Sequence, residues 1–333
     1  MKNKQLLINQ KSLILSIFAL SLIFIAGFRT IGIDNDSLSY ISILGVDISK
    51  ANFIDKEPFF WLINELNKFL FNGYNQTFFL IFAIIGVSIK LYIIRKYSLH
   101  PILSVLTYIS IFYILQEMTQ IRAGVAIGIV FWAMHDLISK NNTGFLLKII
   151  MATLFHYSAI VMIFIYFLSY TSIYRKFYIF LPLLGIFLSQ ISFIPELLVH
   201  LVSILPDFLS IKIQIYLSLM EQDKLKEVNP FNIGNFFLLC IYYLNLYIFT
   251  REQRGEKYYI LCIKLLGFGF FILFTFSFLE VFAYRISNYL FFSLVFLIPI
   301  TGEYFRQKKL LLLLIGLFLI YTLTKNIIYM LNI

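Results

Sequence analysis

The segment from Thr77 to Ile94 reads TFFLIFAIIGVSIKLYII, and Lys90 is its one charged residue. Arg95 and Lys96 follow it directly. A helix of this length is close to the thickness of a bilayer core, which needs about 20 mostly apolar residues. An apolar run that ends in basic residues is typical of a membrane span whose basic end faces the cytoplasm. The segment therefore predicts a transmembrane helix, and the rest of the chain repeats its pattern.

Comparable apolar runs occur throughout the sequence, so we expect an all-α, polytopic integral membrane protein. Nine expected spans cover residues 12–28, 77–94, 99–115, 121–139, 177–194, 233–250, 258–279, 282–300 and 310–331. A further apolar stretch, 145–170, carries His156 at its middle, and we expect a hairpin of two short helices there. The total is then about 11 transmembrane helices in a single membrane domain, residues 1–333. The alternative, one span over 145–170, requires an extra crossing at 195–209.

The composition supports this fold class and excludes others. Of the 333 residues, 60% are hydrophobic and 13% are charged, whereas a soluble domain is about 45–50% apolar and about 25% charged. A soluble globular enzyme and a disordered chain are both excluded. Cys240 and Cys262 lie inside apolar runs, so neither a disulfide framework nor a metal cluster is expected.

The distribution of basic residues assigns a side to each loop. It places on the inner side the N-terminus and the loops around 95–96, 140–148, 175–176, 251–257 and 306–309. Seventeen of the 27 basic and four of the 17 acidic residues then lie inside, which leaves ten basic and thirteen acidic residues outside. The net charge of +10 therefore reflects membrane topology, and we expect no nucleic-acid partner.

Polar groups with a potential function gather on the nearly neutral outer side, in the periplasmic loops 29–76 and 194–232. Two short apolar segments of these loops, Pro58–Phe71 and Pro195–Leu209, suit helices that lie in the membrane interface. No cytoplasmic segment is long enough to form a domain, and the chain has no glycine-rich phosphate loop. ATP hydrolysis on a domain of this chain is therefore excluded.

Arg29, Arg122 and Arg285 lie at outer helix ends. A guanidinium stays charged and binds phosphate oxygens in a bidentate way, so the three could converge on one anion. The alternative for any one of them is contact with lipid headgroups. Glu117 and Glu280 precede Arg122 and Arg285 by five positions, so they do not share a helical face with them. These glutamates either orient the arginines or lie in water.

Asp34, Glu57 and His156 are the candidate proton acceptors, since a general base must reach the proton that it removes. Asp34 and Asp36 form the Asp-x-Asp pattern that holds a metal on nucleotide sugars, but nucleotide sugars are absent outside. His156 could also be a packing residue. No second histidine stands at ligand spacing from it, so we expect no metal and no other cofactor. Tyr40 and Trp61, in the polar outer loop, are the aromatic residues that we expect to contact carbohydrate.

Five short motifs occur in the order of a known family. They are Phe28-Arg29-Thr30-Ile31-Gly32-Ile33-Asp34 with Tyr40, Glu57-Pro58-Phe59-Phe60, Gln120-Ile121-Arg122-Ala123-Gly124-Val125-Ala126, Phe155-His156-Tyr157-Ser158-Ala159 and Tyr284-Arg285-Ile286-Ser287-Asn288-Tyr289. In these motifs the chain resembles the EpsG-like branch of the bacterial polysaccharide polymerases, the Wzy O-antigen polymerase type. The resemblance runs from residue 28 to about residue 300. The loop 194–232 has no match, and substrate specificity is expected there.

The resemblance implies a glycosyltransferase of the bacterial inner membrane, with a GT-C-like architecture and an active site on the periplasmic or outer side. Such an enzyme joins undecaprenyl-pyrophosphate-linked oligosaccharide units into O-antigen, capsular or exopolysaccharide chains. The growing chain leaves its pyrophosphate for the next lipid-linked unit. The residues implied are Arg122, Arg285 and Arg29 on the pyrophosphate, and Asp34, Glu57 or His156 as the base, with Arg122 and His156 in the best-matching motifs. Membrane lipid and a chain-length regulator protein are the other implied partners.

Two other functions compete with this hypothesis. A flippase for lipid-linked oligosaccharide would carry charges deep in a central cavity and show repeats in its hydropathy, and the sequence has no convincing internal repeat. A membrane O-acyltransferase would also use a histidine, but it is expected to draw its acyl donor from the cytoplasmic side.

Overall fold

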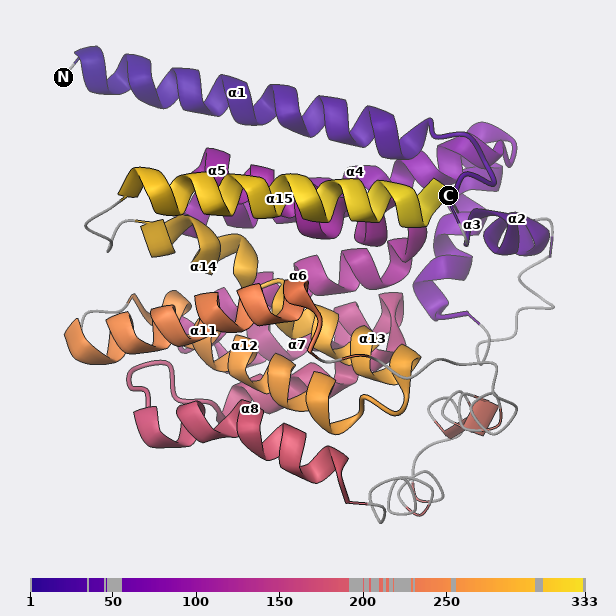
Figure 1. The fold of residues 1–333 in the computed structure, drawn as a ribbon. Coiled ribbons are helices and arrows are strands. Elements are labelled where there is room, and N and C mark those ends of the chain that lie inside the picture. Colours follow the sequence, from indigo (N-terminus) through magenta and orange to yellow (C-terminus); the bar gives the residue numbers. More distant parts are fainter. Residues whose placement is uncertain are drawn as a thin grey trace. The chain divides into compact units, whose positions relative to one another are not determined.

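The computed structural model describes residues 2–34, 36–44, 56–191, 231–252, 256–302 and 308–331, with residues 46 and 229 and scattered positions between 200 and 218. The elements of these described parts are helices, without a strand among them (Figure 1). The all-α expectation is thus confirmed. Most of the loop 194–232, with the expected interfacial helix Pro195–Leu209, lies outside the described residues.

The chain divides into two compact units. The first comprises residues 1–133, 143–156 and 319–333, and the second comprises residues 134–142 and 157–318. Two helices run from one unit into the other. They are α6 (Ile121–Ile138) and α15 (Lys308–Leu331).

The first unit contains helices that range from 8 residues in α2 to 26 residues in α1. Its elements are α1 (Lys2–Gly27), α2 (Ser37–Leu44), α3 (Pro58–Phe71), α4 (Asn75–Tyr97), α5 (Pro101–Tyr108), η2 (Ile109–Thr119), the first part of α6, α7 (Asn142–Phe155) and the last part of α15. Helix α1 packs along α4. Gly27 permits their closest approach, because a Cβ there would lie 2.9 Å from the Cα of Leu80.

Helix α3 has the bounds of the predicted interfacial segment Pro58–Phe71. Pro58 stands at its first helical position, where a missing N–H costs no hydrogen bond. One face of α3 buries Trp61 and Asn64, whereas apolar Leu66 and Phe69 on the other face are exposed. An exposed apolar face suits contact with lipid and agrees with the interfacial placement.

The helix η2 continues α5 with π-helical hydrogen bonding as far as Thr119. A π-helix leaves backbone groups out of the regular ladder and is common at functional sites. In α15, the Asn326 side-chain amide donates to the carbonyls of Ser110 (3.0 Å) and Ile111 (3.2 Å). The chain leaves η2 at Gln120 and starts α6 at the next residue. This break places Arg122 in the first turn of α6.

A buried ion pair joins α4 to η2. The Lys90 ammonium donates to the Glu117 carboxylate, which also accepts a hydrogen bond of 2.8 Å from the Tyr108 hydroxyl. Lys90 is fully buried and Glu117 is 2% exposed. The charge count from the sequence placed Lys90 on the inner side and Glu117 on the outer side, whereas the two neutralise each other inside the protein. Without this pair, the inner side loses one positive charge and the outer side loses one negative charge. The excess of basic residues on the inner side remains.

The second unit is arranged around α12 (Lys257–Thr275), which packs against α8 (Arg175–Ser189), α11 (Ile233–Glu252), α13 (Glu280–Phe291) and α14 (Leu294–Thr301). The unit also contains η3 (Tyr157–Phe167) and the first part of α15. The Tyr242 hydroxyl of α11 donates to the Tyr178 carbonyl of α8 at 2.6 Å. Ser158 of η3 donates to the Tyr289 hydroxyl of α13 at 3.4 Å, which links two of the sequence motifs.

Six helices among the described residues are long and apolar enough to cross a membrane, or seven if the bent pair α13–α14 counts as one span. The expectation of about 11 spans is not confirmed. The difference lies in four short apolar helices, because the apolar part of α1 that the structure describes, Ser12–Gly27, is too short, and α7, η3 and α8 have 14, 11 and 15 residues. A full crossing needs about 20 residues. The expected two helices within 145–170 do occur, and they break at His156. That they run out and back remains a prediction.

Candidate functional site

Glu57 lies at the start of α3, in the first unit. Its backbone is extended and its carbonyl accepts the first helical hydrogen bond, from Phe60 at 3.0 Å. The side chain makes no capping bond and is therefore directed away from its own helix. Glu57 is fully buried, and a buried carboxylate is costly unless charges or donors surround it. The helix N-terminus contributes a positive partial charge beside it.

The two carboxylate oxygens of Glu57 bind two different partners. Oε2 accepts a hydrogen bond from Nη1 of Arg122, and Oε1 lies 2.9 Å from Nδ1 of His156. The Arg122 and His156 side chains are 14% and 11% exposed. Arg122, Glu57 and His156, all in the first unit, thus form one chain of contacts, which we call the Glu57 cluster.

Three separate helix ends bring these residues together. Glu57 begins α3, Arg122 stands in the first turn of α6, and His156 follows the last residue of α7. The His156 amide still donates to the carbonyl of Ala152 at 2.9 Å, so the α7 ladder holds the backbone of this residue. The rings of Phe59 and Phe155 meet at 4.8 Å between centroids and hold the ends of α3 and α7 together.

Aromatic rings cover Arg122. Its guanidinium carbon lies 5.6 Å from the Tyr40 ring centroid and 5.9 Å from that of Phe60, within the range of cation–π attraction. Tyr40, in α2, is 2% exposed. Burial raises the pKa of its phenol, although the charge of Arg122 opposes the shift. Tyr40 is therefore a neutral hydroxyl at physiological pH.

Arg29 and Asp34 pair with each other rather than with the Glu57 cluster. Nε of Arg29 donates to Oδ2 of Asp34 at 3.0 Å, and both side chains are buried. The other oxygen of Asp34 accepts the amides of Asp36 (3.1 Å) and Ser37 (2.9 Å) at the start of α2. Burial lowers the pKa of Arg29, and Asp34 opposes this. The contacts give the pair a structural function, and a catalytic role for either residue remains a prediction.

The other predicted site residues lie elsewhere. Trp61 follows Glu57 by one turn of α3 and is 3% exposed, and its indole N–H has no hydrogen-bond acceptor among the described residues. Arg285 is in α13 of the second unit, so its part in the site remains a prediction. Glu117 was weighed as a residue that orients Arg122, but it pairs with Lys90 instead, and Glu57 takes that place.

Sequence reasoning missed Lys56. Its Nζ lies 5.0 Å from the Tyr40 ring centroid and 5.7 Å from that of Phe60. The sequence signal that could have identified Lys56 was its position directly before Glu57, a candidate site residue. Among the described residues, no three or more histidine, cysteine or acidic side chains gather closely enough to hold a metal ion.

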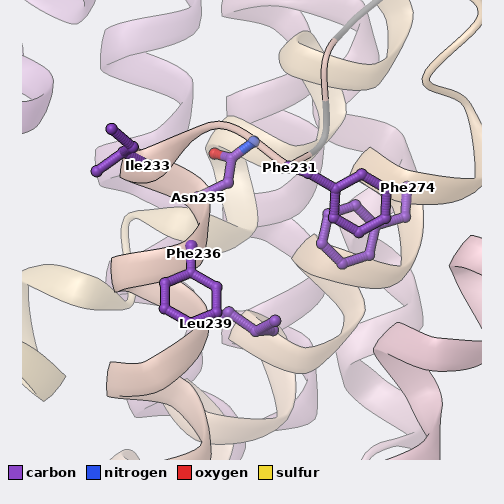
Figure 2. A pocket seen from close by; sticks show the side chains of 6 residues that line it. All are labelled: Phe231, Ile233, Asn235, Phe236, Leu239 and Phe274. Atoms are coloured by element: carbon purple, nitrogen blue, oxygen red, sulfur yellow. The ribbon is translucent and has the colours of Figure 1, made fainter.

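A separate cavity of about 200 Å³ lies in the second unit, at the start of α11 (Figure 2). Its lining is almost entirely apolar, and the rings of Phe231 and Phe274 stack across it with centroids 6.2 Å apart. The lining residues are Phe231, Ile233, Asn235, Phe236, Leu239 and Phe274. None of them is ionisable, so this cavity offers no acid–base chemistry.

A family model described as the EpsG family matches residues 12–332, nearly the whole chain. The chain belongs to the EpsG family. This is a family of Wzy-like polymerases, so membership indicates a polymerase-like role in exopolysaccharide or O-antigen synthesis. No curated protein and no solved structure matches the chain.

The EpsG assignment agrees with the membrane helices, and the protein is an integral membrane protein. Four of the five motifs that carried the resemblance contribute Tyr40, Glu57, Arg122 and His156 to one cluster in the first unit. The fifth motif, around Arg285, belongs to α13 in the second unit. In this EpsG-family chain, short motifs far apart in sequence are thus neighbours in space.

Proposed function

We propose that this protein is a polysaccharide polymerase that joins undecaprenyl-pyrophosphate-linked oligosaccharide units at the outer face of the bacterial inner membrane. The single observation that carries the proposal is the Glu57 carboxylate bound to Arg122 on one oxygen and to His156 on the other. This places a permanent cation and an oriented imidazole side by side. Transfer of a glycan from a diphosphate carrier to a hydroxyl needs one group of each kind.

Arg122 is suited to the leaving group. When the bond between the anomeric carbon and the diphosphate oxygen breaks, negative charge develops on that oxygen, and a fixed cation beside it lowers the barrier. The Arg122 guanidinium presents several donors, of which one binds Glu57. Its Nε–H is buried and has no acceptor among the described residues. Arg122 therefore retains a donor for a phosphate oxygen.

His156 is suited to the incoming hydroxyl. In the tautomer that donates Nδ1–H to Glu57, Nε2 is the ring nitrogen that would take the proton, and the carboxylate would stabilise the imidazolium that forms. The sugar hydroxyl oxygen bonds to the anomeric carbon, its proton passes to Nε2 of His156, and the diphosphate leaves with the electron pair. This direct displacement inverts the anomeric centre. Energy comes from the carrier bond, so the reaction needs no ATP.

The arrangement of basic loops supports an outer location. Arg95 and Lys96 end α4, and Lys140 follows α6, so both helices have basic ends that suit the inner side. Arg122 lies at the opposite end of α6, which then faces outward. Repeat units that have crossed the membrane on their carrier would reach the cluster from that side.

The deletion phenotype separates this function from its competitors. A strain without the protein should attach single repeat units to its surface lipid and should lose the long chains, as seen in a gel of its surface glycan. Complete loss of surface glycan would indicate a flippase instead. Chains of normal length that lack acetyl groups would indicate an O-acyltransferase.

Single substitutions test the named residues in the same strain. Arg122→Ala and His156→Ala should each abolish chain extension while the protein remains inserted in the membrane. Arg95→Ala and His100→Ala remove the same side-chain types from positions outside the cluster and should leave chain length unchanged. Long glycan in the Arg122→Ala strain would contradict the assignment of Arg122 to the diphosphate.

A further inference from the structure

Two cations lie against the same pair of aromatic rings. Tyr40 and Phe60 have ring centroids 6.0 Å apart. Nζ of Lys56 is 5.0 Å from the Tyr40 centroid, and the guanidinium carbon of Arg122 is 5.6 Å from it. The Phe60 centroid lies 5.7 Å from Nζ of Lys56 and 5.9 Å from the guanidinium carbon of Arg122. The separation between Nζ of Lys56 and the guanidinium carbon of Arg122 is therefore no larger than the sum of their two distances to the Tyr40 centroid.

The positive charges of Lys56 and Arg122 repel each other, and nearby anions reduce this repulsion. Glu57 is one such anion, but its two oxygens already bind Arg122 and His156. Asp36 is a second, because its charge contributes to the raised pKa of Tyr40. The aromatic faces offset part of the repulsion. The Lys56 residue is partly exposed.

We infer that Lys56 is a second diphosphate-binding residue, which acts with Arg122 from the shared Tyr40–Phe60 ring pair. This inference rests on the proposed function, because it adds a residue to the same site. The buried Nε–H of Arg122, without an acceptor among the described residues, indicates where an anionic oxygen would bind.

The two cations differ in a way that suits a ligand with two phosphates. A guanidinium is a planar group that binds two oxygens at once, whereas an ammonium is a compact charge with three donors. Arg122 is held by its bond to Glu57 and lies in the first turn of α6, whereas Lys56 lies two residues before the start of α3. One phosphate can bind each cation. A monophosphate would satisfy only one of them.

Binding of a short carrier analogue tests this inference without requiring polymerisation. We would titrate the full-length detergent-solubilised protein with farnesyl diphosphate in a calorimeter. Farnesyl monophosphate, farnesol and phosphatidylglycerol would be titrated in parallel. Lys56→Ala should weaken diphosphate binding about tenfold or more, the scale of one charge-assisted hydrogen bond. Lys56→Arg should restore most of the affinity, and farnesol binding should not change.

Lys68→Ala is the matched control, because it removes a lysine of α3 that pairs with Glu65 away from the rings. It should bind diphosphate like the wild type. Lys56→Gln serves as the second variant if Lys56→Ala does not fold. Wild-type affinity for diphosphate in the Lys56 variants would overturn the inference, and so would equal binding of phosphatidylglycerol.

The same variants separate failure of the inference from failure of the proposed function. Lys56-dependent diphosphate binding by a protein that never extends glycan would support this site and contradict the polymerase. Chain extension by Lys56→Ala with an unchanged KM for the lipid-linked unit would support the polymerase and overturn the role of Lys56.

Discussion

At the scale of single residues, Glu57 connects the two halves of the proposed chemistry. It is fully buried, and each carboxylate oxygen has its own partner. Arg122 gains a fixed orientation from this contact, and His156 gains a fixed tautomer. Neither effect requires Glu57 to touch the substrate, so we regard it as a positioning residue.

Glu57→Gln should therefore reduce kcat more than it changes KM. Arg122 and His156 contact different carboxylate oxygens, so the amide would present its oxygen to one of them and its NH₂ group, which cannot accept, to the other. We expect chain extension to slow by about 10²–10⁴-fold, the scale of lost acid–base catalysis. Initial rates on a purified lipid-linked unit would measure it, with Glu65→Gln as the control on the same helix. An activity close to that of the wild type would show that the carboxylate positions neither partner.

At the scale of elements, the ion pair of Lys90 with Glu117 holds the π-helix η2 in register with α4. Removal of one partner of a buried ion pair leaves an uncompensated charge and costs about 3–5 kcal/mol. The break at Gln120 comes just after this pair, so the register of η2 also decides where α6 begins. The pair therefore supports the position of Arg122 from a distance.

Lys90→Met should lower the thermal stability of the detergent-solubilised protein markedly. Lys90→Met combined with Glu117→Gln should recover most of the loss, because the double variant leaves no unpaired charge in the interior. Melting curves of both proteins would show this order. Equal stability of the two variants would mean that the ion pair does not hold η2 against α4.

The sequence predicted those elements that local pattern decides. Pro58–Phe71 is a helix with the expected bounds, and the chain breaks at His156 between two short helices, as the polar residue in an apolar stretch indicated. The pairing of Lys90 with Glu117 could not be predicted, because it joins residues 27 positions apart on different elements. Lys56 was missed because a lysine in a polar loop usually lies in water. The expected count of about 11 spans is not confirmed among the described residues, because apolar character does not by itself fix helix length.

At the scale of the whole molecule, the proposed function requires the Glu57 cluster to face the outer side of the membrane. We propose, from the distribution of the basic loops, that it faces the outer side. Cysteines introduced into a cysteine-free protein would test this in intact cells. Asn72→Cys, between α3 and α4, should react with an impermeant maleimide, whereas Asn141→Cys, after α6, should react only after the membrane is opened. The reverse pattern would place the cluster on the cytoplasmic side.

Polymerisation by the purified protein would test the proposed activity without other cell components. The protein would be reconstituted in liposomes with one defined undecaprenyl-pyrophosphate-linked repeat unit and no nucleotide. We predict that the wild type produces a ladder of lengthening glycans with inverted linkages. Arg122→Ala and His156→Ala should each abolish the ladder, and Arg95→Ala should leave it unchanged. A ladder of the same length and rate from both cluster variants, or none from the wild type, would contradict this prediction.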